Sequence, residues 1–158
     1  WPVSDICLSC GPGERSPENL SACIDQFREE LKGKWEPKDG LTWCNAFAQA
    51  VTAALQCPLP VALANEQIAW LDGLAGRSSG WAETTREHAI VHAQMGGPCL
   101  VTFANPTGHG HIAVMRPVPP GADPADAPFI AQAGRENFLV GRMVRGFSHL
   151  PVRFWSHQ

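Results

Sequence analysis

Two short stretches carry the residues that can do covalent chemistry. Cys44 follows Trp43 at the predicted start of a helix, and His111 follows Gly110 at the predicted start of an apolar strand. A helix N-terminus presents unpaired backbone N–H groups and the positive end of the dipole, which favour a thiolate and predict a lowered pKa for Cys44. An imidazole fixed by a strand can act as general base toward that thiol and as acid toward a leaving amine. We therefore expect a nucleophilic cysteine–histidine pair.

A polar side chain in a later strand is the candidate for the third role. Gln132 lies within the apolar run 129–133, where a buried amide needs a hydrogen-bond partner. An imidazole N–H is such a partner, and the contact would hold one histidine tautomer in place. Asn137 is a second option for this role.

Each of these residues also has a plainer reading. Cys44 alone could be a structural thiol or half of a disulfide, and Gln132 could face outward from its strand. His109 competes with His111 for the role of base, and together the two imidazoles of the His-Gly-His run could bind a metal. We favour His111 as the base because the strand fixes it, whereas His109 lies in a glycine-rich loop.

The elements that must position these residues follow from periodicity and caps. Residues 1–15 read as an irregular arm, and 16–158 read as one domain. Ser16, Pro17 and Glu18 open a helix that Gly33 closes. Further helices are predicted from 44 to about 58, from a cap at Asn65 to Gly73, and from Thr84 to Gly96. Strands are predicted at 98–104, 111–116, 129–133, 140–144 and 152–155. Helices followed by strands indicate an α+β domain with a mostly antiparallel sheet of about five strands.

Composition and charge exclude several function classes. The chain has 158 residues with 12 Lys and Arg against 15 Asp and Glu, so the basic excess of a nucleic-acid binder is missing. The segment 41–65 has no Asp, Glu, Lys or Arg. Its prolines and side-chain amides nevertheless predict a helix and a turn instead of a membrane span.

The six cysteines and the first residue, Trp1, indicate a mature chain that is secreted or periplasmic. Disulfides are expected among Cys7, Cys10, Cys23, Cys57 and Cys99, with connectivity open. The Cys7–Cys10 spacing suits a zinc ligand pair, but no second such pair exists. We therefore predict no metal and no cofactor.

The order of a cysteine on a helix, a histidine opening a strand and a polar residue on the next strand resembles the papain-like cell-wall hydrolases of the CHAP and NlpC-like families. The matching stretches are Thr42-Trp43-Cys44-Asn45-Ala46-Phe47 and Gly110-His111-Ile112-Ala113-Val114-Met115. The pattern also resembles the small peptidoglycan amidases that type VI secretion systems deliver. The resemblance covers roughly residues 41–155.

The resemblance implies a papain-like fold in which the nucleophile begins a helix packed on an antiparallel sheet. Cys44 would be the nucleophile, His111 the base and Gln132 the orienting residue, although an amide there cannot supply a carboxylate charge. Trp43, Asn45 and His109 would contact the substrate, a peptidoglycan stem peptide cleaved at an amide bond. A monomeric secreted antibacterial effector of this kind would have a cognate immunity protein as partner.

Two further functions stay open at this point. The same pair could serve a protease, deamidase or acyltransferase that acts on a protein, because fold does not fix the reaction. The chain could also be a non-enzymatic, disulfide-stapled binding module, in which Cys44 would be bridged.

Overall fold

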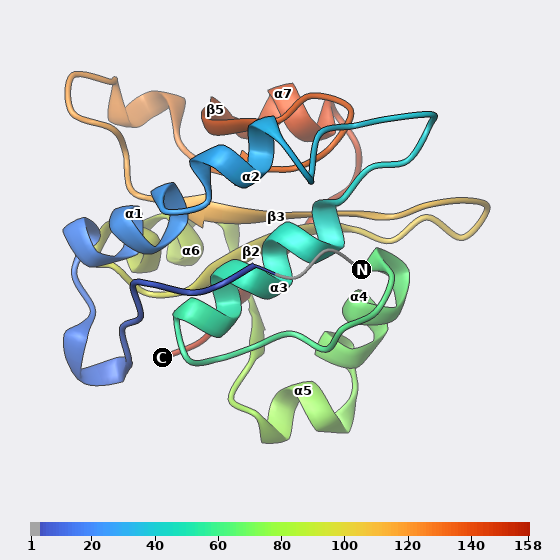
Figure 1. The fold of residues 1–158 in the computed structure, drawn as a ribbon. Helices are drawn as coiled ribbons and strands as arrows, with labels where there is room; N and C mark the ends of the chain where they lie inside the picture. The colour runs from blue at the N-terminus through green and yellow to red at the C-terminus, as the bar shows by residue number, and fades with distance from the viewer. Residues whose placement is uncertain (1–3) are drawn as a thin grey trace.

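An open antiparallel sheet of six strands lies at the centre of the computed structural model, which describes residues 4–158 (Figure 1). Its spatial order is β1-β6-β2-β3-β4-β5, so the strand that carries His111 is an interior strand. The strands are β1 (Ala82–Thr84), β2 (Cys99–Phe103), β3 (His111–Arg116), β4 (Phe129–Gln132), β5 (Phe138–Arg142) and β6 (Arg153–Ser156).

Helices precede most of the strands in the chain and pack against the sheet. They are α1 (Pro17–Asp25), α2 (Arg28–Lys32), α3 (Cys44–Ala54), α4 (Ala64–Asp72), α5 (Leu74–Ser78), α6 (Arg86–Gln94) and α7 (Met143–Phe147), with single 3-10 turns at Pro12–Glu14 and Pro124–Asp126. Figure 1 shows α1, α2 and α3 along the front of the sheet, with α4 to the right of α3 and α5 at the bottom. The predicted α+β class with N-terminal helices on an antiparallel sheet is confirmed.

Several predicted caps and boundaries are confirmed. The Ser16 hydroxyl accepts from the N–H of Asn19 at the start of α1, and Gly33 follows the last residue of α2. α3 begins at Cys44. The predicted helix 16–33 is divided at Phe27, which leaves helical geometry between α1 and α2 and is fully buried there.

Other boundaries were predicted wrongly, each for a local reason. Thr85, not Thr84, caps α6 by accepting from the N–H of His88, while Thr84 ends strand β1. Asn65 is the second residue of α4 and not its cap, because its side chain bonds elsewhere. The strand predicted at 140–144 lies at 138–142. Residues 143 and 144, which were predicted to end that strand, begin the short helix α7. Strand β1 and helices α5 and α7 were not predicted.

The core forms where α3 packs on β3 and on the α1–α2 segment. Nine of the eleven residues of α3 are buried, from Cys44 through Ala54. Phe27, Trp35 and Phe47 form an aromatic cluster with ring centroids 5.7 to 6.4 Å apart. Asn137 donates to the carbonyl oxygens of Leu31 and Trp35, which fastens this cluster to the β4–β5 turn. α3 is therefore buried along most of its length, from its first residue, Cys44, onward.

All six cysteines are free thiols in the structure. The expected disulfides among Cys7, Cys10, Cys23, Cys57 and Cys99 are thus not formed in this state, and Cys44 is not bridged. Trp1, from which we inferred a removed leader, lies outside the described residues.

Candidate active site

Cys44 begins α3 and is 5 % exposed. The backbone N–H of Ile112, the residue after His111, faces its sulfur, as do the N–H groups of Cys44 and Asn45 at the helix terminus. These amides lower the pKa of the Cys44 thiol, but burial is the larger influence and raises it. The predicted lowering of the Cys44 pKa is therefore wrong in direction. Burial destabilises the thiolate by more free energy than the N–H groups of the helix terminus stabilise it.

His111 begins β3 and is joined to the third predicted residue. Its Nε2 lies 2.8 Å from Oε1 of Gln132, which is buried in β4. The antiparallel register pairs Val114 with Ala131, and one step further it sets Gln132 opposite Ala113. Ala113 and His111 share a face of β3 because side chains alternate along a strand. The register itself thus brings the amide to the imidazole.

The hydrogen-bond network fixes the proton on the imidazole ring. The Gln132 Nε2 donates to the carbonyl oxygen of Glu136 at 2.9 Å, so its Oε1 must be the atom that faces His111. An amide oxygen only accepts, so Nε2 of the ring carries the hydrogen and Nδ1 is left as the basic nitrogen. Burial lowers the pKa of His111, and the Gln132 bond opposes this by raising it. The imidazole is therefore neutral near pH 7.

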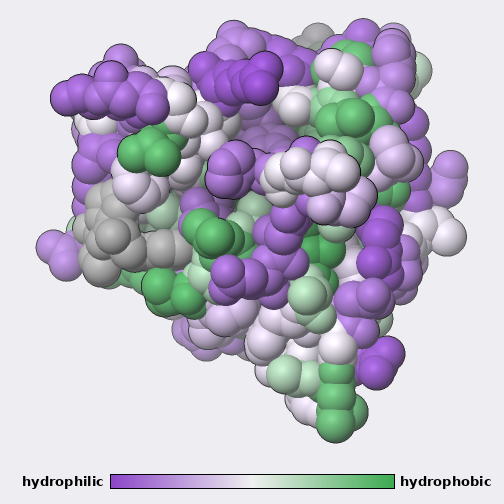
Figure 2. Space-filling model, turned by 90° about the vertical axis from the view of Figure 1, so that its right-hand side faces the viewer, coloured by the Kyte–Doolittle hydropathy of each residue, from purple (hydrophilic) through white to green (hydrophobic). Residues whose placement is uncertain are grey.

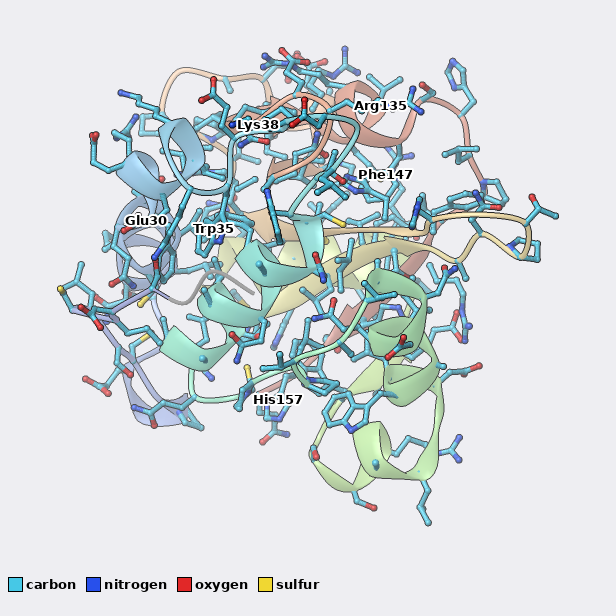
Figure 3. The ribbon with its side chains drawn as sticks, turned by 45° about the vertical axis from the view of Figure 1, so that its right-hand side comes forward. Glu30, Trp35, Lys38, Arg135, Phe147 and His157 are labelled. Carbon is cyan, nitrogen blue, oxygen red and sulfur yellow. The ribbon has the colours of Figure 1, made fainter. Side chains whose placement is uncertain are left out.

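Residues of α7 and of the β4–β5 turn lie close to the His111 imidazole and to the Gln132 amide. The ring of Phe147 lies 4.7 Å from the ring of His111, and Figure 3 shows Phe147 extending from α7 on the side where α3 begins. A Cβ atom at Gly146 would stand 2.1 Å from Oε1 of Gln132, and one at Gly134 would stand 3.2 Å from Cε1 of His111. Glycine at 146 therefore leaves the space that the amide occupies.

Asn65 is the residue of this site that the sequence analysis misread. Its Nδ2 donates to the carbonyl oxygens of Asn105 at 3.0 Å and Gly108 at 2.8 Å, and its Oδ1 accepts from the N–H of Asn105. A Cβ atom at Gly110 would lie 2.3 Å from that Oδ1. Asn65 thus fixes the β2–β3 loop that ends at His111. A polar residue on the buried side of a helix, like Gln132 in its strand, was the available signal.

The three residues predicted to contact substrate lie in different surroundings. Trp43 is half-buried, precedes α3 and packs against the core. Asn45 is 8 % exposed, and its Nδ2 donates to the carbonyl oxygen of Ala62 at 2.9 Å, so its side chain braces the loop before α4. His109 is exposed in the β2–β3 loop. The alternative orienting residue, Asn137, bonds to Leu31 and Trp35 instead of a histidine.

The surface at this end of the molecule mixes apolar and charged side chains. Figure 2 shows green and purple patches interspersed on this face, which is indented near its upper middle. Arg142 and Arg145 pair with Asp126 and Glu136. Arg135 is exposed directly after Gly134, and Figure 3 shows it at the upper edge of the molecule.

Two negative findings apply to residues 4–158. No grouping of three or more His, Cys, Asp or Glu side chains is placed to hold a metal ion. None of the helices in this range has the length and apolar character needed to cross a membrane.

No protein-family model matches the chain, and no curated protein matches it. The likeness to papain-like wall hydrolases therefore rests on the two short stretches around Cys44 and His111.

Proposed function

We propose that the chain is a cysteine hydrolase that cleaves amide bonds in peptidoglycan stem peptides. The observation that carries the reaction type is the arrangement of three groups. The sulfur of Cys44 faces the backbone N–H of Ile112, and the preceding residue, His111, has its far nitrogen held by the buried Gln132. The substrate class comes from the resemblance of the two sequence stretches.

The resting pair is a neutral thiol and a neutral imidazole. The pKa of the Cys44 thiol is raised by burial and the pKa of His111 is lowered by burial, so both shifts disfavour a preformed ion pair. His111 then acts as a general base during attack, when Nδ1 takes the thiol proton as the sulfur bonds to the substrate carbonyl carbon. The Gln132 oxygen stabilises the resulting imidazolium by accepting from Nε2.

The rest of the cycle uses the same groups. The backbone N–H of Cys44 at the helix terminus stabilises the oxyanion. The C–N bond breaks as His111 returns its proton to the leaving amine, which leaves a thioester on Cys44. Water, deprotonated by His111, then attacks the thioester, and the carboxylate product leaves as the thiol is restored.

Digestion of purified peptidoglycan tests this proposal. We expect release of soluble fragments with new amine and carboxyl ends by the unmodified chain, and none by Cys44→Ala. Cys7→Ser is the matched control, because Cys7 is an exposed thiol and its loss should leave the rate unchanged. Fragment release by Cys44→Ala at the original rate would overturn the proposal.

A parallel digestion of an unfolded protein substrate separates the substrate classes. If casein is cut by a Cys44-dependent reaction while peptidoglycan is not, the reaction type stands and the substrate class is wrong. For a peptidoglycan enzyme of this kind we also propose action outside the producing cell, as a monomer, with an immunity protein as its inhibitor. Size measurement in solution and co-purification from the producing cells test these two points.

A further inference from the structure

A second group of thiols lies at the opposite end of α3 from Cys44. Cys10 in the N-terminal arm, Cys23 on α1 and Cys57 just after α3 are each no more than 5 % exposed. The Sγ atoms of Cys10 and Cys23 are 3.8 Å apart. The N–H of Cys10 donates to the carbonyl oxygen of Ala54. Cys44 is the first of the eleven residues of α3, so the two ends are about 15 Å apart along the helix axis.

The arm is held in place by contacts other than the sulfur pair. Arg15 donates to the carbonyl oxygens of Cys10, Leu55 and Gln158, at 2.7 to 2.9 Å. Gln26, at the end of α1, accepts from the N–H groups of Cys7 and Leu8 and donates to the Leu8 carbonyl oxygen. The backbone is thus fixed on both sides of Cys10, which keeps its sulfur against Cys23.

We propose that Cys10 and Cys23 are a disulfide-forming pair that closes when the chain meets a small-molecule disulfide such as glutathione disulfide. Closure requires the two sulfurs to approach by less than about 2 Å, to the length of an S–S bond. Within residues 4–158 the Cys10–Cys23 contact is the one hydrogen bond between two cysteine sulfurs. The bond would join the arm to α1 and close the loop between residues 10 and 23.

The reaction is an exchange in two steps. One protein thiolate attacks the oxidant's S–S bond, which forms a mixed disulfide and releases one reduced thiol. The second protein thiolate attacks the protein sulfur of that mixed disulfide, forms the Cys10–Cys23 bond and releases a second reduced thiol. The protein loses two electrons and two protons to the oxidant. Because burial raises the pKa of Cys23 to about 12, exchange quickens as the pH rises.

Cys57 is the competing partner for Cys10. Burial raises its pKa to about 12, and both Arg15 and Cys10 are near enough to influence it. Cys10 and Cys23 share a side-chain hydrogen bond between their sulfurs, whereas Cys10 acts on Cys57 through charge alone. The structure therefore favours Cys23 as the partner, and the experiment must separate the two.

The test is peptide mapping of the full chain after incubation with glutathione disulfide at mildly alkaline pH and alkylation of the remaining thiols. Trypsin cleaves after Arg15, so Cys10 and Cys23 fall in separate peptides that stay joined only if the bond has formed. Cys7→Ser is analysed in parallel, because Cys7 shares the peptide of Cys10. We expect the 10–23 linkage in both proteins. Alkylation of both residues, or a linkage from Cys10 to Cys57, would overturn the proposal.

Thermal unfolding supplies an independent readout. Oxidation should raise Tm by roughly 5 to 10 °C, because the crosslink restricts the unfolded chain. Cys7→Ser should keep this rise and Cys23→Ser should lose it; an equal rise in Cys23→Ser would contradict the pairing. Neither readout requires hydrolysis, so this inference can fail without the proposed function failing, and the reverse also holds.

Discussion

The two ends of α3 hold buried thiols with different neighbours. At the N-terminal end, Cys44 meets backbone N–H groups of the helix and of the strand that begins with His111. At the other end, Cys10 and Cys23 meet each other beside the Arg15 guanidinium. Burial raises the pKa of both Cys44 and Cys23, so burial does not distinguish them. The neighbours do: Cys44 faces backbone N–H groups, whereas the sulfurs of Cys10 and Cys23 face each other.

The largest expected effect is the loss of activity when Cys44 is replaced. Cys44→Ala removes the nucleophile and should lower kcat/KM for peptidoglycan by at least about 10⁴-fold. Cys23→Ser, at the other end of the helix, should keep activity within about twofold at a temperature below its Tm. Fragment release followed over time measures both. Comparable losses in the two variants would show that the two thiol regions do not differ in the way proposed.

The next effect concerns the base. His111→Ala should lower kcat/KM by about 10²- to 10⁴-fold, since the thiol then has no proton acceptor. His109→Ala, two residues earlier in the exposed loop, should cost no more than a few fold. The double variant of Cys44 and His111 should be no worse than Cys44→Ala, because residues that act as a unit are non-additive. If His109→Ala is the more damaging, the base has been misassigned.

The orienting amide is tested by the pH profile. Because burial lowers the pKa of His111, activity should fall on the acid side with a midpoint below about 6.5, as the base becomes protonated. The Gln132 hydrogen bond raises the pKa of His111, so Gln132→Ala should move that midpoint lower still. Gln132→Glu places a carboxylate beside the ring and should move it higher. An acid midpoint identical in all three proteins would remove Gln132 from the site.

The smallest effect concerns the loop that ends at His111. Asn65→Ala removes three hydrogen bonds to the β2–β3 loop and should lower kcat about tenfold, with the acid midpoint unchanged. Asn65→Asp keeps the acceptor for the Asn105 N–H but sets an anion against two carbonyl oxygens, so it should be at least as impaired. Hydrogen exchange should quicken at residues 105–110 in both variants. Unchanged rates of catalysis and exchange would mean that Asn65 does not position this loop.

The sequence predicted the elements whose signals are local. Ser16 before Pro17 marked α1, and the apolar runs after Gly97 marked five of the six strands, with β5 displaced by two residues. Strand β1 and helix α7 were missed because each is only a few residues long and lies mostly at the surface, where periodicity is weak. Asn65 was misread because a side chain that bonds forty residues away looks, in sequence, like a helix cap.

Of the candidate site, the contact between His111 and Gln132 was predicted correctly, whereas the direction of the Cys44 pKa shift was not. The link between His111 and Gln132 follows from strand register, which alternation along the two strands anticipates. The pKa direction at Cys44 depends on how deeply tertiary packing buries the first turn of α3, and no local pattern contains that information. The contact between Cys10 and Cys23 likewise depends on how the arm folds back on α1.

Covalent trapping tests the central claim, that Cys44 is a nucleophile served by His111, most directly. A stem-peptide analogue with an electrophile in place of the scissile amide is incubated with the unmodified chain and with His111→Ala, and the adducts are mapped by mass spectrometry. We expect an adduct on Cys44 alone, formed at least about 10²-fold more slowly in His111→Ala. An adduct on another cysteine, or equal rates in the two proteins, would contradict it.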